Sequence, residues 1–282
     1  MTASFPPTIV RADGNFARAD FDTQNWTCHL CSGRGGSYVV DEDGYDIWRI
    51  CECQKHLRRQ SLFNAAGIGR RYVDATLDSY QPRHNQELAN ALRLASDFTL
   101  MYPSVAGGLL FWGPVGTGKT HLAVGIFREL TLRKGVSCRF VDYGNLLQDI
   151  KRSFSKKEGD AALMLPLVEV ELLVIDELGK GRGTEWEESV LDDLISRRYN
   201  AGKITLCTTN FEPRDDSGPT TGSINAAYEG RSSQAARAGK APSLKERVGD
   251  RIYSRLCEMC EFVPMTGGDY RRTAQDLSRR TR

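Results

Sequence analysis

The chain has 282 residues, of which 40% are hydrophobic and 26% are charged, with a formal net charge of +2. This is the balance of a globular protein with a sizeable core, and the length allows one large or two modest domains. Uninterrupted apolar runs of about eighteen residues are missing, which excludes a membrane-spanning helix. The N-terminus also lacks the basic start and apolar run of a secretory signal. We therefore expect a cytoplasmic protein with reduced cysteines and no membrane partner.

Four cysteines stand close together near the start of the chain: Cys28, Cys31, Cys51 and Cys53. Two close pairs about 15–20 residues apart are typical of a tetrahedral zinc site, although C-x-C is tighter than the usual second pair. His29 or His56 could therefore replace one cysteine. Unligated cysteines and disulfides are the alternatives, and the expected compartment disfavours disulfides. We expect structural Zn²⁺ to fold residues 1–60 as a small module.

Apolar runs alternate with amphipathic stretches in the middle of the chain. Strands are expected at 108–113, 137–143, 171–178 and 203–211, and helices at 85–102, 119–135, 144–157 and 185–202. Such alternation predicts a parallel sheet with helices on both faces, an α/β fold. Gly135 and Gly202 follow two of these helices as C-terminal caps often do.

The last third of the chain changes in composition. Residues 213–243 are rich in Gly, Ser, Thr and Ala, which predicts a mobile insertion. A helix is expected at 244–260 and a last strand at 261–265, and residues 273–282 form a basic tail. Basic residues outnumber acidic ones after Arg231, which indicates an acidic or phosphate-bearing partner.

The segment GPVGTGKT matches the phosphate-binding loop G-x-x-x-x-G-K-[ST] in full, between an apolar strand and an amphipathic helix. Its glycines let backbone N–H groups face a phosphate chain, and the following helix adds its positive dipole. Lys119 would reach the β- and γ-phosphates, and Thr120 would ligate Mg²⁺. The expected ATP-binding residues of this segment are Gly113, Pro114, Val115, Gly116, Thr117, Gly118, Lys119, Thr120 and His121.

A second acidic motif follows about 60 residues later. The apolar run of the strand at 171–178 leads directly into Asp176 and Glu177. Buried carboxylates are costly unless they are used, so we expect Asp176 to hold Mg²⁺ and Glu177 to activate the attacking water. Asn210, at the end of the next strand, could position the same water. The water-activating glutamate favours ATP hydrolysis over transfer to a substrate hydroxyl.

These motifs, in this order, resemble those of an AAA+ ATPase, and the closer resemblance is to DnaC/DnaI-type replicative helicase loaders and IstB-like ATPases. AGIGRRYVDATLDSY (66–80) resembles the segment that lies over the adenine, and DRIYSRL resembles the box with the arginine finger. The resemblance covers about 66–212 and 244–272. It implies that Arg255 is the finger, with Arg251 as the competing assignment, and that Arg271 contacts the nucleotide, with Arg272 as the alternative.

The resemblance also indicates partners. Zinc-bearing loaders have a front module similar to residues 1–60, which docks a partner. DIKRSFSKK combines basic residues with an aromatic one, so Lys151, Arg152 and Phe154 could bind single-stranded DNA. A solvated helix end is the alternative interpretation. Cys257 and Cys260, a second C-x₂-C without a partner pair, are expected to pack as apolar residues.

The sequence thus predicts an AAA+ P-loop domain at residues 85–272, preceded by the zinc module (1–60) and a linker with the adenine-side segment (61–84). The expected function is ATP-driven loading of a hexameric replicative helicase onto single-stranded DNA, with self-association through the ATP sites. An IstB-like transposition ATPase is one alternative. An adaptor that binds ATP with little hydrolysis is the other.

Overall fold

The computed structural model describes residues 5–23, 26–155, 161–214 and 242–270. The expected insertion at 213–243 therefore lies almost entirely outside the described residues. Arg271, Arg272 and the basic tail also lie outside them. Within the described part, no helix is both long and apolar enough to cross a membrane.

A five-stranded sheet forms the centre of the molecule, and each neighbouring pair of its strands is parallel. The order across the sheet is β6-β7-β8-β5-β9. The strands are β6 (Cys138–Asp142), β7 (Leu172–Asp176), β8 (Ile204–Thr209), β5 (Gly108–Trp112) and β9 (Cys260–Pro264). All five lie where strands were expected, so the prediction of an α/β fold with a parallel sheet is confirmed.

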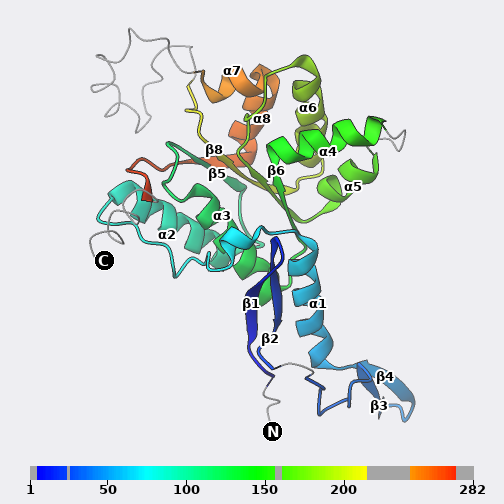
Figure 1. The fold of residues 1–282 in the computed structure, drawn as a ribbon. Helices are drawn as coiled ribbons and strands as arrows, with labels where there is room; N and C mark the ends of the chain where they lie inside the picture. Colours follow the sequence, from blue (N-terminus) through cyan, green and yellow to red (C-terminus); the bar gives the residue numbers. More distant parts are fainter. Residues whose placement is uncertain (1–4, 24–25, 156–160, 215–241, 271–282) are drawn as a thin grey trace.

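Two hydrophobic cores lie on the two faces of this sheet, because alternate side chains of each strand point to opposite sides. One core contains Leu109, Phe111, Leu172, Val174 and Leu206. The other contains Leu110, Trp112, Leu173, Ile175 and Cys207. The first is covered by α1 (Glu52–Ala65), α2 (Gln86–Met101) and α3 (Lys119–Arg128). The second is covered by α4 (Tyr143–Ser155), α5 (Ala161–Glu169), α6 (Glu185–Asn200), α7 (Leu244–Val248) and α8 (Asp250–Met259) (Figure 1).

Several helix boundaries differ from the sequence prediction. The expected helix at 244–260 is two helices, because Gly249 breaks it with φ of 84° and Glu188 lies where a Cβ would stand. The expected helix at 119–135 ends as α3 and continues as a π-helical turn, η2 (Glu129–Lys134). Gly135 and Gly202 follow their helices with left-handed φ angles of 74° and 59°, as expected of C-terminal caps. Helix α5, which contains Pro166, was not predicted.

The front region consists of two hairpins and a helix. The first hairpin is β1 (Thr8–Asp13) with β2 (Phe16–Phe21), and the second is β3 (Gly36–Val40) with β4 (Asp46–Ile50). A short 3-10 turn, η1 (Arg70–Tyr72), follows helix α1. Helix α1 was not predicted, and it extends past residue 60, where the front module was expected to end.

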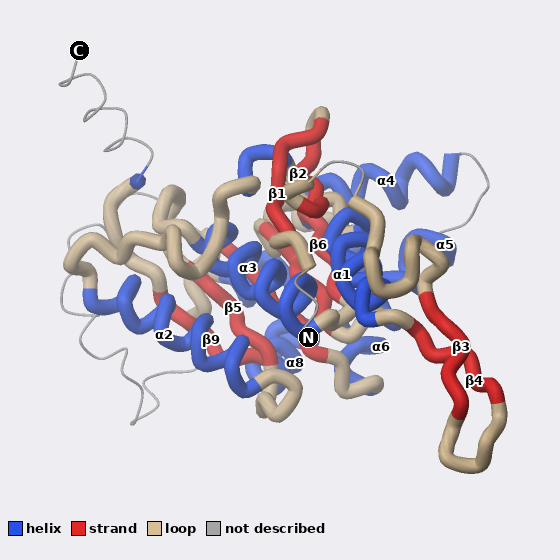
Figure 2. Tube along the Cα trace, turned by 90° about the horizontal axis from the view of Figure 1, so that it is seen from below, coloured by secondary structure: helices blue, strands red, loops and turns tan. Residues whose placement is uncertain are grey.

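Hydrophobic contacts continue across residue 60 and tie part of the front region to the ATPase core. Phe63 of α1 packs against Phe127 of α3 with ring centroids 5.8 Å apart, and Ala17 and Ala19 of β2 belong to the same core. Asn64 holds β2 as well, since its side chain exchanges hydrogen bonds of 2.7 and 3.0 Å with the backbone of Ala19. The β3–β4 hairpin, in contrast, extends away from this body (Figures 1 and 2).

Candidate nucleotide and metal sites

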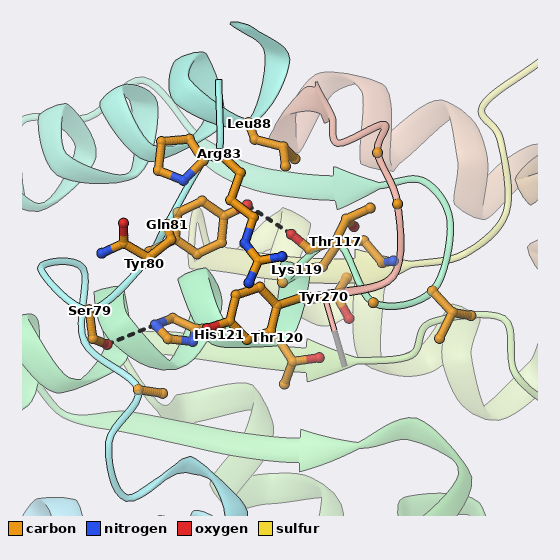
Figure 3. A pocket seen from close by; sticks show the side chains of 18 of the residues that line it. Ser79, Tyr80, Gln81, Arg83, Leu88, Thr117, Lys119, Thr120, His121 and Tyr270 are labelled. Atoms are coloured by element: carbon orange, nitrogen blue, oxygen red, sulfur yellow. Dashed lines mark hydrogen bonds between the residues drawn. The ribbon is translucent and has the colours of Figure 1, made fainter. Parts of the chain in front are cut away.

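A cavity of about 650 Å³ opens at the carboxyl ends of β5, β7 and β8. Four segments line it: the phosphate-binding loop, residues 71–88, the strand ends with Glu177 and Asn210, and residues 267–270 (Figure 3). Ligand cavities of this size hold molecules such as nucleotides. In open parallel sheets ligands bind outside the carboxyl ends of the strands, which is where this cavity lies.

The phosphate-binding loop approaches its neighbours too closely for side chains at its glycines. A Cβ on Gly118, whose φ is 91°, would lie 2.5 Å from the Tyr80 ring. The buried Lys119 ammonium donates hydrogen bonds to the carbonyls of Gly113, at 2.8 Å, and Pro114, at 2.6 Å. These are loop oxygens, so the lysine is held at the loop where phosphate oxygens could replace them as acceptors.

Asp176 at the end of β7 is buried and joined to two hydroxyls. Thr120 donates to its Oδ1 at 2.8 Å, and Thr208 of β8 donates to the same oxygen at 2.6 Å. The other oxygen, Oδ2, is buried and has no hydrogen-bond partner among the described residues. Burial raises the pKa of Asp176, and the neighbouring acids Glu177 and Asp142 raise it further. Clustered acids, a threonine hydroxyl and an unsatisfied carboxylate oxygen suit a hard cation such as Mg²⁺.

Glu177 lines the cavity in a strained conformation. Its φ of 57° is a left-handed value that a residue with a side chain rarely adopts, and such strain gathers at functional sites. Its N–H donates to the Thr208 hydroxyl at 3.0 Å. Its carboxylate accepts a hydrogen bond from Lys180, and this contact raises the pKa of Lys180. Thr208 therefore positions both acids of the pair, a role that the sequence analysis missed although it singled out Asn210 two residues later.

Asn210 follows β8 and lines the same cavity as Lys119, Thr120 and Glu177. The structure thus brings together four of the expected site residues, although the first and the last of them are 91 positions apart in the chain. Asn210 itself is exposed at this edge of the sheet. An exposed amide at the mouth of the cavity is accessible to a water molecule or a phosphate oxygen.

The adenine-side segment is fastened to the phosphate-binding loop by Tyr80 and His121. The Tyr80 hydroxyl donates to the Thr117 carbonyl at 2.8 Å, and burial raises the pKa of this tyrosine. His121 Nε2 lies 2.8 Å from the Thr76 carbonyl and 3.1 Å from the Ser79 hydroxyl (Figure 3). His121 lines the cavity, as expected of a nucleotide-binding residue, and its Nε2 contacts the chain's own adenine-side segment. Its contact with the nucleotide stays a prediction.

Two further residues line the cavity that the sequence reasoning did not single out. Tyr270 donates its backbone N–H to the Gly116 carbonyl at 3.0 Å, which brings the end of the described chain over the phosphate-binding loop. The guanidinium of Arg83 lies 4.2 Å from the centroid of the Tyr270 ring (Figure 3). The family resemblance pointed to this region through Arg271, the residue that follows Tyr270.

The two candidate finger arginines lie on α8, and neither lines the cavity of its own chain. Arg255 donates to Asp192 of α6 at 2.6 Å, and Arg251 lies 3.5 Å from the other oxygen of the same carboxylate. The Arg251 side chain is 72% exposed and that of Arg255 is 19% exposed. Arg251 is therefore the more exposed of the two, whereas Arg255 is held close to Asp192.

The four front cysteines converge, with all their sulfur atoms within 4.8 Å of one another. Cys28 and Cys51 sulfurs are 3.7 Å apart, and those of Cys31 and Cys53 are 3.6 Å apart. A tetrahedron of sulfurs around zinc, with Zn–S of about 2.3 Å, has edges of about 3.8 Å, whereas disulfide sulfurs are about 2.0 Å apart. The geometry therefore fits zinc.

The surroundings of the sulfurs also suit a metal. Burial raises the pKa of the Cys31 thiol, but hydrogen bonds from the Gly35 backbone and the other thiols bring it down to about 7. Burial and the neighbouring thiols raise the pKa of Cys53 to about 12, so within the cluster Cys31 most readily becomes the thiolate that zinc requires. Among the described residues the cluster consists of cysteines alone. His56 instead packs between Phe5 and Phe21, at 4.7 and 6.5 Å, and burial lowers its pKa. His29 is exposed.

The predicted DNA contacts lie on α4, on the face of the sheet away from the zinc cluster. Lys151 lies 3.7 Å from Glu187 and 4.6 Å from the centroid of the Trp186 ring, and Arg152 pairs with Asp149 at 3.2 Å. Both basic side chains are exposed, and the side chain of Phe154 lies outside the described part.

The second C-x₂-C pair was expected to pack as apolar residues. Cys260 is buried as expected, but Cys257 is exposed.

The fold and these sites together define a P-loop ATPase domain of the AAA+ type, preceded by a four-cysteine cluster suited to zinc. Residues 52–214, more than half of the chain, match the family of IstB-like ATP-binding proteins. The chain belongs to that family.

Known relatives include replication proteins. The replicative helicase loader DnaC of Escherichia coli (strain K12) is 28% identical over 155 residues, 55% of this chain and 62% of DnaC. The crystal structure of the DnaC helicase loader aligns with 70% of this chain and 99% of its own, with 28% identity and a TM-score of 0.56. The phage-like element PBSX protein XkdC of Bacillus subtilis (strain 168) is 23% identical over 68% of this chain and 75% of its own. The chain thus spans about 62% of the first relative's length.

Proposed function

We propose that this protein binds and hydrolyses ATP to load a hexameric replicative helicase onto single-stranded DNA. The observation that carries the proposal is the convergence of Lys119, Thr120 and Glu177 around one cavity, with Asp176 hydrogen-bonded to Thr120 at its edge. The likeness to DnaC, in sequence and in fold, supports the choice of a helicase as the partner.

The residues of the cavity suit the parts of ATP hydrolysis. Thr120 and Asp176 would hold Mg²⁺, which supplies charge stabilisation for the leaving and transferred phosphates when it is bound. Lys119 would exchange its loop carbonyls for β- and γ-phosphate oxygens. Glu177 would take the proton of the attacking water, and Asn210 would orient that water. Tyr80, fastened to the phosphate-binding loop, would border the adenine side.

Hydrolysis would be completed by an arginine from a neighbouring subunit, because neither Arg251 nor Arg255 lines its own cavity. An arginine supplied in trans contributes roughly 10³–10⁵ in rate, so assembly would control hydrolysis. Arg255 is the assignment that the resemblance implies. The greater exposure of Arg251 favours it as the residue that reaches out, with the anchored Arg255 and Asp192 orienting α8.

The front module would dock the helicase, and zinc held by Cys28, Cys31, Cys51 and Cys53 would fold it. Lys151 and Arg152, both exposed on α4, would contact DNA phosphates. ATP would favour self-association and DNA engagement, and hydrolysis would release the helicase.

The test is ATPase activity measured together with helicase binding. Glu177→Gln should abolish hydrolysis but keep ATP binding, and a chain lacking residues 26–51 should hydrolyse ATP but lose the hexameric helicase in a pull-down. Full ATPase activity in Glu177→Gln would refute the catalytic assignment. Binding to a transposase, without binding to the helicase, would favour the second candidate, an IstB-like transposition ATPase, which the family match supports.

A further inference from the structure

The β3–β4 hairpin carries a ladder of exposed apolar side chains. Tyr38, Val40, Trp48 and Ile50 have relative exposures of 70%, 66%, 47% and 68%. In both views the hairpin projects away from the rest of the molecule (Figures 1 and 2). Contiguous exposed apolar surface on a folded protein marks an interaction site, because it remains in water at a cost until a partner covers it.

The strand register puts these four side chains on one face. Tyr38 pairs with Trp48, Gly36 with Ile50 and Val40 with Asp46, and positions two apart along a strand share a face. The other face carries Ser37 opposite Arg49 and Val39 opposite Ile47. We name the first set, Tyr38, Val40, Trp48 and Ile50, the aromatic face.

The aromatic face is held in shape before any partner arrives. The Tyr38 and Trp48 rings meet edge to face, with centroids 5.1 Å apart. Gly36 makes room for this arrangement, since a Cβ there would lie 2.6 Å from the Trp48 ring. The base of the hairpin is fastened to the cysteine cluster, because the Cys51 N–H donates to the Gly35 carbonyl at 2.9 Å. A rigid surface loses little conformational entropy on binding.

The charges around the aromatic face select the partner. Between Gly36 and Ile50 the acidic residues are Asp41, Glu42, Asp43 and Asp46, and the single base is Arg49. Arg49 lies on the opposite face, whereas Asp46 shares the aromatic face beside Val40. Exposed aromatic rings also stack on nucleic-acid bases, but such sites surround the rings with basic residues that neutralise phosphates. Here the surrounding charge would repel phosphates.

We propose that the aromatic face docks a protein segment that presents large apolar side chains flanked by lysines and arginines. Tyr38 and Trp48 supply the anchors, in keeping with the enrichment of aromatic residues among binding hot spots. The acidic tip supplies charge complementarity and accelerates the encounter. This proposal deepens the docking role given above to the front module, since it names the surface and the chemistry of the partner.

The test uses two defined peptide probes and two matched variants of the full chain. Both peptides are amphipathic helices with the same Leu and Trp face, and one carries Lys where the other carries Glu. One variant is Tyr38→Ser with Trp48→Ser, on the aromatic face. The control is Val39→Ser with Ile47→Ser, which removes apolar side chains from the opposite face of the same hairpin. Zinc content, measured for each protein, checks that the module is folded.

We expect the Lys peptide to bind at least about tenfold more tightly than the Glu peptide, a difference of about 1.4 kcal/mol, because the acidic residues of the hairpin attract lysines and repel glutamates. The aromatic-face variant should lose that binding and the control should keep it within about twofold, and salt should weaken it. Equal affinities for the two peptides, or loss in the control as well, would overturn the proposal. So would binding of an oligonucleotide, or of a second copy of the chain, that the aromatic-face variant alone abolishes.

The purified replicative helicase separates this proposal from the proposed function. If the helicase binds the wild-type chain and both variants equally, the helicase docks elsewhere and the aromatic face is refuted while the loader function stands. If the helicase does not bind but the Lys peptide binds as expected, the helicase assignment fails and the aromatic face stands.

Discussion

Lys180 holds the carboxylate of Glu177, so we predict that Lys180→Met raises the rate of ATP hydrolysis. Lys180 stands three residues after Glu177 in the loop that follows β7, and its side chain is 64% exposed. An oxygen that accepts a hydrogen bond from an ammonium group is a poorer base toward water. The ion pair must therefore open before Glu177 can take a proton, and the free energy of the pair adds to the barrier.

The magnitude follows from the exposure of the pair. Exposed ion pairs contribute about 0.2–1 kcal/mol to stability. We place the Lys180–Glu177 pair in the upper half of this range, because the Glu177 side chain is only 29% exposed and its carboxylate raises the pKa of Lys180. At about 1.4 kcal/mol per tenfold in rate, the gain is about two- to fivefold. The affinity for ATP should not change, because Lys180 is not among the residues that line the cavity.

Single-turnover hydrolysis with saturating Mg²⁺ and ATP isolates the chemical step, at a protein concentration that saturates assembly. Lys180→Arg keeps the ion pair and should match the wild type. A rate for Lys180→Met that equals or falls below the wild-type rate, with unchanged ATP affinity, would show that Lys180 does not restrain Glu177.

Three further predictions concern other parts of the molecule. Thr208→Val removes the hydroxyl that donates to Asp176 at 2.6 Å, so the hydrolysis rate should fall about tenfold, the effect of one hydrogen bond to a charged group, while ATP affinity in a titration stays within about threefold. Arg198→Leu should lower the free energy of unfolding in a denaturant titration by about 2–4 kcal/mol, because the fully buried guanidinium donates to the carbonyls of Leu167, Val168 and Val170 at 2.7–3.2 Å and these would be left unsatisfied. Cys53→Ser should reduce the zinc bound per chain whereas His56→Ala should not, and the opposite result would make the histidine the fourth ligand.

Local signals in the sequence predicted the sheet and the centre of the candidate site. The strands of the sheet are continuous apolar runs, because a strand buried on both faces needs apolar residues at successive positions, and such runs are visible without a structure. The phosphate-binding loop is recognisable because glycine is required where the backbone must turn sharply around phosphate. Asp176 and Glu177 stood out because they end a buried strand.

Long-range contacts were not visible in the same way. Thr208 and Thr209 both stand at the end of β8. Which of them faces Asp176 depends on how β8 pairs with the neighbouring strand β7, and the structure places Thr208 there. Arg198 looks like a surface residue at the end of a helix, yet it is fully buried because carbonyls from the α5 region converge on it. The exposure of Arg251 relative to Arg255 likewise depends on how α8 packs against α6.

The sequence by itself determined the chemistry that this protein has at its disposal: a phosphate-binding loop, an acidic pair and four clustered cysteines, each set by residues that are neighbours in the chain. The tertiary structure decided where the front region belongs. Helix α1 and the β1–β2 hairpin join the ATPase core because Phe63 and Ala17 find apolar partners there. The β3–β4 hairpin stays outside because two strands cannot bury their own apolar face. Whether an apolar side chain is buried depends on residues that are distant in the chain. The packing of the helices and strands therefore decided that the aromatic face stays exposed while α1 and the β1–β2 hairpin join the core.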